Sequence, residues 1–376
     1  MLPRVTTAPP SRARPGAAGD RKLSIGLIAS ARHPIREPFA GGLESQTHAL
    51  ATAMRKRGHT VRVFASAESD PALGFEPVCP PGLGLNLSDA SREDESMPAE
   101  SFLEEHHAYL SLMMRLRDAS LDVIHNNSLH YMPIAMAEVL PCPLLTTLHT
   151  PPTPWIESAA KSVAGRPNLH WVAVSHVTAE HWDPILAAGV IHNGVDTRRW
   201  RPATGDEQAE RVAWTGRIVP EKGPHHALRA AKRAGLPCVI AGPVGDETYF
   251  RELVQPELDD QRTFAGHLDR ASLRDLVAGS AVAAVTPCWE EPFGLVIAEA
   301  LACGTPVAAW DRGAVGELLP ESCGRIARAG DVDDLARAIR AAIAEVHRPE
   351  CRRHAEARLG LDRMIDQYEE LFARLT

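Results

Sequence analysis

The stretch Val282–Val307 constrains this chain more than any other, and it reads VAAVTPCWEEPFGLVIAEALACGTPV. It predicts a short apolar strand, Val282–Thr286, followed by a turn and by a helix that begins near Gly294 and ends before Gly304. The helix is apolar on every side, which indicates a buried element, and Glu299 is its only charged residue. A lone buried carboxylate is strongly destabilising, so we expect Glu299 to have a partner.

A second carboxylate, Glu291, lies just before the same helix. The first N–H groups of a helix and the positive end of its dipole attract anions. A protein carboxylate at this place competes with a bound anion, and we expect the two to divide the space.

Length and composition limit the classes of protein that remain. The 376 residues are enough for two domains with a core each, and 44% apolar and 23% charged residues are ordinary values for a soluble protein. The net charge of −8 argues against a nucleic-acid partner, because such proteins need a basic surface. No apolar run approaches the roughly 18 residues of a membrane span, and the N-terminus lacks the apolar core of a signal peptide. These features predict a cytoplasmic protein without a transmembrane segment.

The cysteines carry little functional signal. There are seven of them, without a C-x-x-C pair. This pattern predicts reduced, mostly buried thiols and no zinc site.

Two successive α/β patterns run along the chain. In the first, the strand Leu23–Ala29, a glycine turn, a helix from Gly42 to Gly58 and the strand Thr60–Ala65 form a βαβ unit. Such a unit requires a parallel sheet and a right-handed crossover. A long polar loop is expected over residues 66–98, and further units follow up to about Pro202.

The pattern restarts after a polar linker, Ala203–Glu210, with the strands Val212–Thr215 and Cys238–Ala241 on either side of a helix. The last predicted helix, Ala355–Leu375, carries a continuous apolar stripe and must pack against another part of the chain. Doubly wound sheets bind ligands at the carboxyl ends of their strands, so a cleft between the two halves is the predicted site.

Two cations lie on the turn that follows the strand Val212–Thr215. Arg217 and Lys222 are five residues apart, a spacing that lets a guanidinium and an ammonium group converge on one diphosphate. The alternative is a solvated basic turn without a ligand. The motif near Glu291 in the same half of the chain favours the diphosphate.

Together these motifs resemble those of family 4 of the retaining nucleotide-sugar glycosyltransferases, enzymes of the GT-B fold. The segment from Glu291 to Glu299, with Phe293 and Gly294 inside it, resembles the family's E-x7-E element, and residues 216–223 resemble its G-R-x-x-x-x-K-G element. The resemblance implies an α/β fold of two doubly wound, Rossmann-like domains that face each other across a cleft, with a C-terminal helix that crosses back to the first domain.

The domain boundaries expected from this pattern follow the linker and the last helix. Residues 1–20 are predicted to be a disordered tail. Residues 21–202 form an N-terminal, acceptor-side domain, residues 203–350 form a nucleotide-sugar donor domain, and residues 351–376 form the helix that packs on the first domain.

The resemblance also implies roles for particular residues. Glu299 accepts hydrogen bonds from the ribose hydroxyls of the donor, and an ion pair with an internal arginine is the structural alternative. Glu291 contacts hydroxyls of the donor sugar, although Glu290 is adjacent and could take this role. The implied donor-binding residues are Gly41, Gly42, Gly242, Val244, His267, Leu268, Phe293, Gly294, Leu295 and Glu299.

A histidine is expected on the acceptor side of the cleft. His149 follows a strand and resembles the cleft histidine that lies against the donor sugar in this family, although a lone histidine after a strand is more often structural. It is expected to position the sugar, and it is grouped with Arg217, Lys222 and Glu291 as catalytic. His125, Asn127 and His130 follow another strand and are expected to line the acceptor side.

No metal or other cofactor is expected. The D-x-D segment Asp331-Val332-Asp333 precedes a helix, so capping of that helix explains it better than metal binding. The implied function is transfer of a sugar, of the hexosyltransferase type, from a nucleoside-diphosphate sugar to an unidentified hydroxyl acceptor, without a metal. A nucleotide-sugar epimerase and a non-catalytic nucleotide-sugar binding protein remain as alternatives. The sequence leaves the donor base, the donor sugar and a peripheral membrane contact open.

Overall fold

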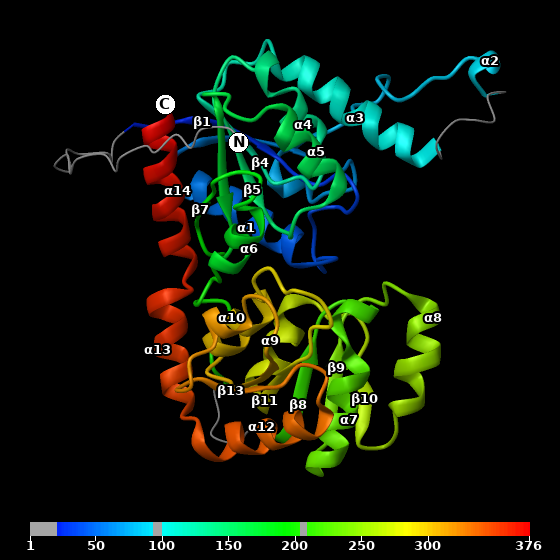
Figure 1. Ribbon diagram of the computed structural model, residues 1–376, viewed down its shortest axis with the longest axis vertical. Helices are drawn as coiled ribbons and strands as arrows, with labels where there is room; N and C mark the ends of the chain where they lie inside the picture. Colours follow the sequence, from blue (N-terminus) through cyan, green and yellow to red (C-terminus); the bar gives the residue numbers. More distant parts are fainter. Residues whose placement is uncertain (1–20, 93–99, 204–208) are drawn as a thin grey trace.

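The computed structural model describes residues 21–92, 100–203 and 209–376. Two α/β domains lie one above the other, and a pair of C-terminal helices runs along one side of both (Figure 1). The predicted tail over residues 1–20, and most of the predicted linker, residues 204–208, lie outside the described residues.

The first domain is built on a seven-stranded parallel sheet in the order β3-β2-β1-β4-β5-β6-β7. Its strands are β1 (Ser24–Ile28), β2 (Thr60–Ala65), β3 (Phe75–Pro77), β4 (Val123–Asn126), β5 (Leu144–Leu148), β6 (Leu169–Ala173) and β7 (Gly189–Val190). Its α-helices are α1 (Gly42–Lys56), α2 (Asp89–Arg92), α3 (Glu100–Leu116), α4 (Met132–Ala135), α5 (Pro154–Ser162) and α6 (His176–Trp182). The central strands β1, β4 and β5 are buried along nearly their whole length because helices cover both faces of the sheet.

The second domain holds a six-stranded parallel sheet in the order β10-β9-β8-β11-β12-β13. Its strands are β8 (Ala209–Thr215), β9 (Cys238–Ala241), β10 (Arg262–Phe264), β11 (Ser280–Val285), β12 (Val307–Trp310) and β13 (Gly324–Ala327). Its α-helices are α7 (Pro224–Ala234), α8 (Glu247–Tyr249), α9 (Arg270–Ala278), α10 (Leu295–Ala302), α11 (Val315–Leu318) and α12 (Val332–Glu345).

Each sheet has one place where the chain reverses the direction in which it adds strands. In the first sheet this switch point lies between β1 and β4, and in the second it lies between β8 and β11. Loops that leave the carboxyl ends of such neighbouring strands diverge and open a crevice. The predicted Arg217 and Glu291 motifs follow β8 and β11, so both belong to the switch point of the second sheet.

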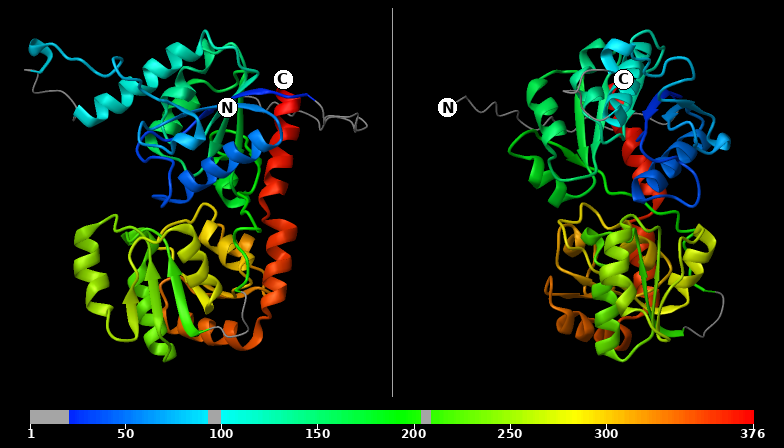
Figure 2. Two further views of the ribbon diagram at one scale, coloured as in Figure 1. Left: turned by 180° about the vertical axis from the view of Figure 1, so that it is seen from behind. Right: turned by 90° about the vertical axis from the view of Figure 1, so that its right-hand side faces the viewer.

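The C-terminal segment consists of two helices instead of the single predicted helix Ala355–Leu375. α13 (Arg348–Arg358) buries Cys351 and Ala355 in the core of the second domain, and α14 (Leu361–Leu375) packs against the first domain (Figure 2). The predicted boundary at residue 351 is therefore too early, because the chain crosses between the domains at Gly360.

Hydrogen bonds explain why the helix breaks there. Val195 N donates to Leu359 O at 2.8 Å, and Leu361 N donates to Val195 O at 2.9 Å. A Cβ on Gly194 would lie 2.7 Å from the Leu361 Cα, so this crossing requires a glycine at position 194.

The structure confirms the predicted fold class and most central elements. It adds short elements that the sequence analysis missed, namely β3 inside the predicted long loop, β13 inside the charged segment after β12, and the helices α5, α6 and α11. All seven cysteines are free thiols, and five of them are buried. Among the described residues, no helix combines the length and apolar character that crossing a membrane requires.

The packing of α14 on the first domain yields a stability prediction. Phe372 is 1% exposed and lies against His125 and Tyr368. Phe372→Ala should lower the free energy of unfolding by about 3–5 kcal/mol, because it leaves a cavity in a buried interface. Chemical denaturation measures the change. Arg374→Ala is the control, because this side chain of the same helix is 66% exposed and should alter stability little. Equal stabilities of the two variants would contradict the observed packing.

Candidate active site

A cavity of about 210 Å³ lies between the two domains, at the carboxyl ends of their strands. The first domain contributes the loop Glu37–Gly42, and the second contributes the loops after β8, β9 and β11. Of the predicted residues, Gly41, Gly42, Arg217, Lys222, Gly242, His267, Leu268, Glu291, Gly294, Leu295 and Glu299 line this cavity. The sequence motifs therefore meet at one place.

Of the two predicted cations, Arg217 is held loosely and Lys222 is held tightly. The Arg217 guanidinium is 42% exposed and lies 3.6 Å from Glu221. Lys222 Nζ lies 2.6 Å from Glu291 Oε2 and 5.1 Å from the ring centre of Trp289. An anion that enters the cavity can reach the Arg217 side chain directly, whereas it must share Lys222 with Glu291.

The adjacent residues Glu291 and Glu290 differ in whether they face the cavity. Glu291 is 8% exposed, lines the cavity and also accepts a hydrogen bond from Trp289 Nε1 at 3.1 Å. Glu290 instead accepts from Gly313 N at 3.0 Å and does not line the cavity. Of these two adjacent carboxylates, only Glu291 therefore faces the cavity.

The N-terminus of α10 opens onto the cavity. Gly294, with a φ of 88°, is its N-cap residue, and no side chain caps its free N–H groups. Gly294, Leu295 and Val296 all line the cavity. Uncapped N–H groups at a helix N-terminus form a ready site for an anion such as a phosphate.

Glu299 has no ion pair or hydrogen bond to its carboxylate among the described residues. Burial raises the pKa of this carboxyl to about 8, and the positive charge of Arg270 offsets only part of that effect. The predicted alternative of a direct ion pair is not realised, since Arg270 pairs with Glu37 at 3.0 Å. A carboxyl group that lines a cavity without a protein partner is suited to bind ligand hydroxyls.

On the first domain, His149 and Asn127 lie together at the ends of β5 and β4. His149 Nε2 lies 3.0 Å from Asn127 Oδ1, and because an amide oxygen only accepts, Nε2 carries the hydrogen. Burial lowers the pKa of His149 to about 4, so the ring is neutral near pH 7. Neither residue is among those that line the cavity between the domains.

Two of the predicted acceptor-side histidines are core residues instead. His125 is 1% exposed, bonds to Thr147 Oγ1 at 2.7 Å and packs under Tyr368 of α14. His130 is 6% exposed and stacks between the rings of Tyr109 and Tyr131. Burial lowers the pKa of His125 to about 3 and that of His130 to about 4, as expected for neutral core rings.

Two predicted donor-side residues also do not line the cavity. Phe293 is 3% exposed and packs in the hydrophobic core of the second domain. Val244 pairs with Ile218 through a β-bridge, whereas its neighbours Gly242 and Pro243 do line the cavity. At Gly242, where φ is 150°, a Cβ would lie 1.8 Å from Gly216 O, so only glycine permits this close approach of the two loops.

Sequence reasoning missed several cavity residues. Arg270 extends from the start of α9, its guanidinium lies 4.8 Å from the ring centre of Phe39, and its side chain is 16% exposed. Together with the bond between His267 Nε2 and Phe39 O at 3.1 Å, it joins the two domains beside Glu299. Other missed lining residues are Ser45, Trp200, Trp214, Leu273 and Pro287. No local motif marks them, because only the approach of distant loops brings them here.

The D-x-D segment has structural roles. Asp331 caps α12 by accepting a hydrogen bond from Asp334 N at 2.9 Å, and Asp333 pairs with Arg233. Neither aspartate lines the cavity.

Comparison with known proteins defines the class of enzyme. The family model described as "Glycosyl transferases group 1" matches residues 196–358, and the model "Glycosyltransferase Family 4" matches residues 40–199. Together they span most of both domains and all residues that line the cavity except Glu37, Pro38 and Phe39. The chain belongs to the family 4, group 1 glycosyltransferases of the GT-B fold, and it is a glycosyltransferase.

Individual relatives show the same relationship. Glycogen synthase of Mycobacterium tuberculosis (strain ATCC 25618 / H37Rv) is 28% identical over 349 residues, which span 81% of this chain and 82% of that protein. D-inositol 3-phosphate glycosyltransferase of Mycolicibacterium paratuberculosis is 29% identical over 345 residues, 78% of this chain and 75% of that protein.

Solved structures share the fold. The Anabaena protein HepE, in complex with UDP and glucose, matches with a TM-score of 0.73 at 20% identity and covers 94% of this chain and 100% of its own. AviGT4, a glycosyltransferase involved in avilamycin A biosynthesis, matches with a TM-score of 0.68 at 22% identity and covers 94% and 98%.

The environment of Glu299 predicts how stability depends on pH. Its pKa is about 8 in the folded protein against an ordinary value of 4.5, so the folded state binds more protons than the unfolded chain between these limits. The contribution of Glu299 to stability therefore falls as pH rises through this window. Glu299→Gln removes this loss, so the melting temperature of the variant relative to the native protein should rise from about pH 5 to about pH 8.

Thermal unfolding at several pH values measures this difference. Glu252→Gln is the control, because the Glu252 side chain is 63% exposed and its replacement should give a curve parallel to that of the native protein. A parallel curve for Glu299→Gln would show that this carboxyl is ordinarily solvated.

Proposed function

We propose that this glycosyltransferase moves a hexose from a nucleoside-diphosphate sugar to a hydroxyl acceptor, with retention of the anomeric configuration and without a metal ion. The observation that carries the proposal is the cavity between the domains. It combines two cationic side chains and uncapped N–H donors for a diphosphate with the Glu299 carboxyl, which has no partner among the described residues. In this proposal the nucleoside diphosphate lies on the second domain and the acceptor approaches from the first.

Arg217, Lys222 and the N–H groups at the start of α10 would act on the leaving group. As the bond between the anomeric carbon and the diphosphate oxygen breaks, negative charge grows on the diphosphate, and fixed donors stabilise it. Glu291, held at 2.6 Å from Lys222, would contact the sugar hydroxyls next to that charge. Glu299 would accept hydrogen bonds from the ribose hydroxyls.

His149 is not suited to be the general base of an inverting reaction. Inversion needs a general base that removes the acceptor proton as the acceptor oxygen attacks, and such a base works best with a pKa near the working pH. With a pKa of about 4, His149 is a weak base. In the retaining reaction the departing phosphate oxygen takes the acceptor proton, and His149, oriented by Asn127, positions the sugar.

The test uses the full chain with candidate donors and a panel of hydroxyl acceptors. A melting-temperature screen against UDP, GDP, ADP and their sugars identifies the base, since a ligand at about one hundred times its Kd stabilises the folded state by about 2.7 kcal/mol. UDP-glucose is tried first because the similar HepE structure has been obtained in complex with UDP-glucose.

NMR of the product then reports its anomeric configuration. An α-linked product from an α-linked donor supports retention, and a β-linked product contradicts it. Conversion of the donor to another nucleotide sugar without any acceptor would indicate an epimerase. Donor binding without turnover across the acceptor panel would indicate a binding protein.

Arg217 offers the clearest test of the diphosphate site. Arg217→Ala should lower turnover by about 10²-fold, because it removes a donor to the leaving group, and should change the free energy of unfolding by no more than about 0.5 kcal/mol. Steady-state kinetics and denaturation measure the two effects. Arg251→Ala is a matched control, since Arg251 makes the same kind of exposed pair, 3.6 Å from Glu252, away from the cavity. Equal kinetics of both variants would remove Arg217 from the site.

Lys222→Ala is a less selective variant. The Lys222 and Glu291 side chains are only 24% and 10% exposed, so removing the ammonium leaves a largely buried carboxylate unpaired and destabilises the fold as well.

Metal independence predicts that transfer persists in excess EDTA. The protein cations would supply the positive charge that a metal otherwise provides, so the rate in EDTA should stay close to the rate with added Mg²⁺. Initial rates measured under both conditions show whether transfer depends on a metal ion. Loss of transfer in EDTA and its recovery with Mg²⁺ or Mn²⁺ would contradict metal independence.

A further inference from the structure

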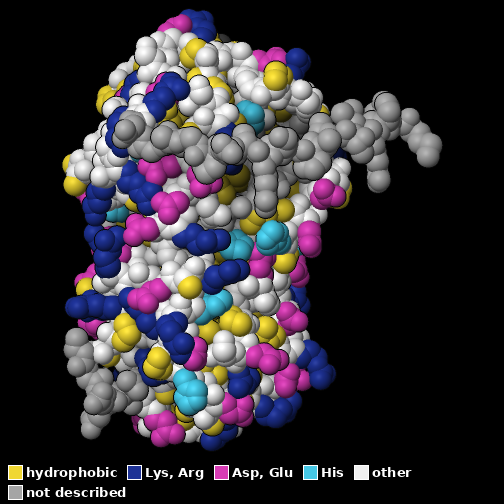
Figure 3. All heavy atoms as spheres, turned by 90° about the vertical axis from the view of Figure 1, so that its left-hand side faces the viewer, with side chains coloured by type: hydrophobic (Ala, Val, Ile, Leu, Met, Phe, Trp, Pro, Cys, Tyr) yellow, Lys and Arg dark blue, Asp and Glu magenta, His cyan; other side chains and the backbone are white. Residues whose placement is uncertain are grey.

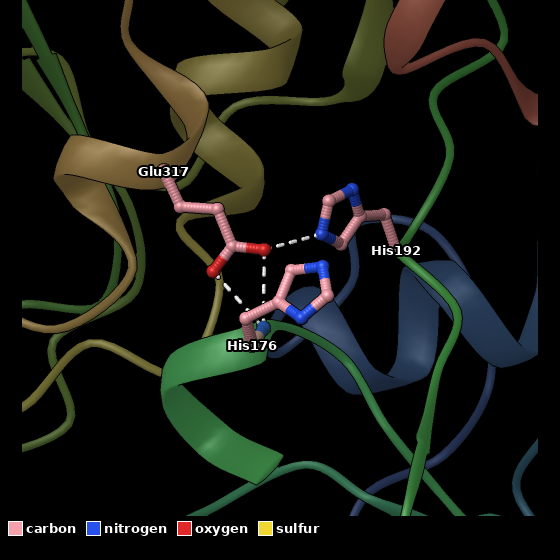
Figure 4. Close-up of side chains that lie close together, drawn as sticks. All are labelled: His176, His192 and Glu317. Carbon is pink, nitrogen blue, oxygen red and sulfur yellow. Dashed lines mark hydrogen bonds and ion pairs between the residues drawn. The ribbon is translucent and has the colours of Figure 1, made fainter. Parts of the chain in front are cut away.

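Three side chains with metal-ligating atoms meet at the junction of the two domains, outside the donor cavity. His176 begins α6 and His192 follows β7, both in the first domain, whereas Glu317 belongs to α11 of the second. Their ligand atoms all lie within 4.8 Å of one another, and Figure 4 shows a ring nitrogen of His192 facing the carboxylate of Glu317, with the His176 ring beside them. None of the three lines the donor cavity.

The carboxylate of Glu317 is held in place by the first domain. Both of its oxygens lie 3.0 Å from His176 N, one also accepts from Val177 N at 3.4 Å, and the other lies 2.5 Å from His192 Nε2. These hydrogen bonds orient the carboxylate, and outer hydrogen bonds of this kind position metal ligands in known sites.

The two imidazoles complete a recognised ligand set. His192 already directs Nε2 at the carboxylate, and its ring is 5.9 Å from that of His176. The His176 ring is exposed and makes no hydrogen bond to any described residue, so it can turn toward the other two ligands. Two histidines and one carboxylate hold Zn²⁺ in proteins, with ligand distances of about 2.0–2.2 Å and a fourth position for water.

An ion can reach this place from solvent. A cavity of about 750 Å³ lies beside the trio, and both His176 and His192 line it. Glu180 and Asp183 add negative charge to its wall, and Arg358 and Arg363 add positive charge. Figure 3 shows the face of the molecule viewed from the α13 and α14 side, where histidine and charged side chains of both signs gather at mid-height.

We propose that His176, His192 and Glu317 form an interdomain binding site for a divalent transition-metal ion, for which Zn²⁺ is the best match. Two ligands come from the first domain and one from the second, so the ion ties the domains together. The donor cavity lies elsewhere, so this ion does not take part in sugar transfer.

Zn²⁺ titration of the EDTA-stripped and dialysed protein, followed by calorimetry, tests the proposal. All samples carry Cys288→Ser, because Cys288 is an exposed thiol that could bind the ion itself. We expect one equivalent of Zn²⁺ to bind, and His176→Ala to lower the affinity at least about tenfold, since it removes a ligand and leaves the hydrogen bonds of Glu317 intact. His347→Ala is the control, because His347 is also an exposed histidine but lies outside the trio.

Equal affinities of the native protein and His176→Ala would overturn the proposal, and so would an equal loss in His347→Ala. A complete absence of Zn²⁺ binding would do the same and would leave His192 and Glu317 as an interdomain ion pair. The visible absorption of bound Co²⁺ gives a second readout, because the expected tetrahedral site has a stronger spectrum than an octahedral surface site.

Glu317→Gln tests the interdomain part separately. The Gln carbonyl can still accept hydrogen bonds from the α6 backbone but is a poor zinc ligand, so Zn²⁺ affinity should fall as it does in His176→Ala. An unchanged Zn²⁺ affinity of Glu317→Gln would mean that only the first domain binds the ion. It would contradict a site that links the two domains. These measurements need no nucleotide sugar, so their failure and a failure of the proposed transfer reaction are distinguishable.

Discussion

The geometry of the site depends on hydrogen bonds between α6 of the first domain and the loop before α10. Ser175 Oγ donates to Pro292 O at 2.6 Å, and Thr178 Oγ1 donates to the same carbonyl at 3.1 Å. Both hydroxyl groups are buried, and Pro292 is the neighbour of Glu291. These bonds fix Glu291 relative to the first domain, so the same contacts set the arrangement of the domains and the shape of the cavity between them.

The two carboxyl groups of the E-x7-E element, Glu291 and Glu299, behave differently because their surroundings differ. Glu291 has Lys222 at 2.6 Å, whereas Glu299 has no partner in the part of the chain that the structure describes, and burial raises its pKa to about 8. A buried carboxyl without a protein partner destabilises the fold. Such a group is typical of a functional site, where a ligand supplies the missing hydrogen bonds. Arg270 is close enough to moderate the charge, but Glu37 of the opposite domain holds it.

The fold could be predicted where local signals agree with burial. The bounds of β2 and β9 match the predicted strands, because each is a mainly β-branched or apolar run bounded by glycine, proline or polar residues. The short strands β3 and β13 were missed because pairing with a neighbouring strand, and not their own few residues, makes them extended. The last segment was predicted to be a single helix because its apolar stripe continues past Gly360. In the structure, backbone hydrogen bonds to Val195 interrupt the helix at this residue.

The sequence by itself determined the class of this protein and four residues that line the cavity between the domains, because Arg217, Lys222, Glu291 and Glu299 lie on short motifs that follow two strands of one sheet. Tertiary structure alone decided the rest. It placed His125 and Phe293 in the core, since a histidine or phenylalanine beside a motif carries no local sign of which way it points. It also brought together residues far apart in the chain, around Glu299 in the cavity and around Glu317 at the domain junction, because such groups depend on how two sheets face each other.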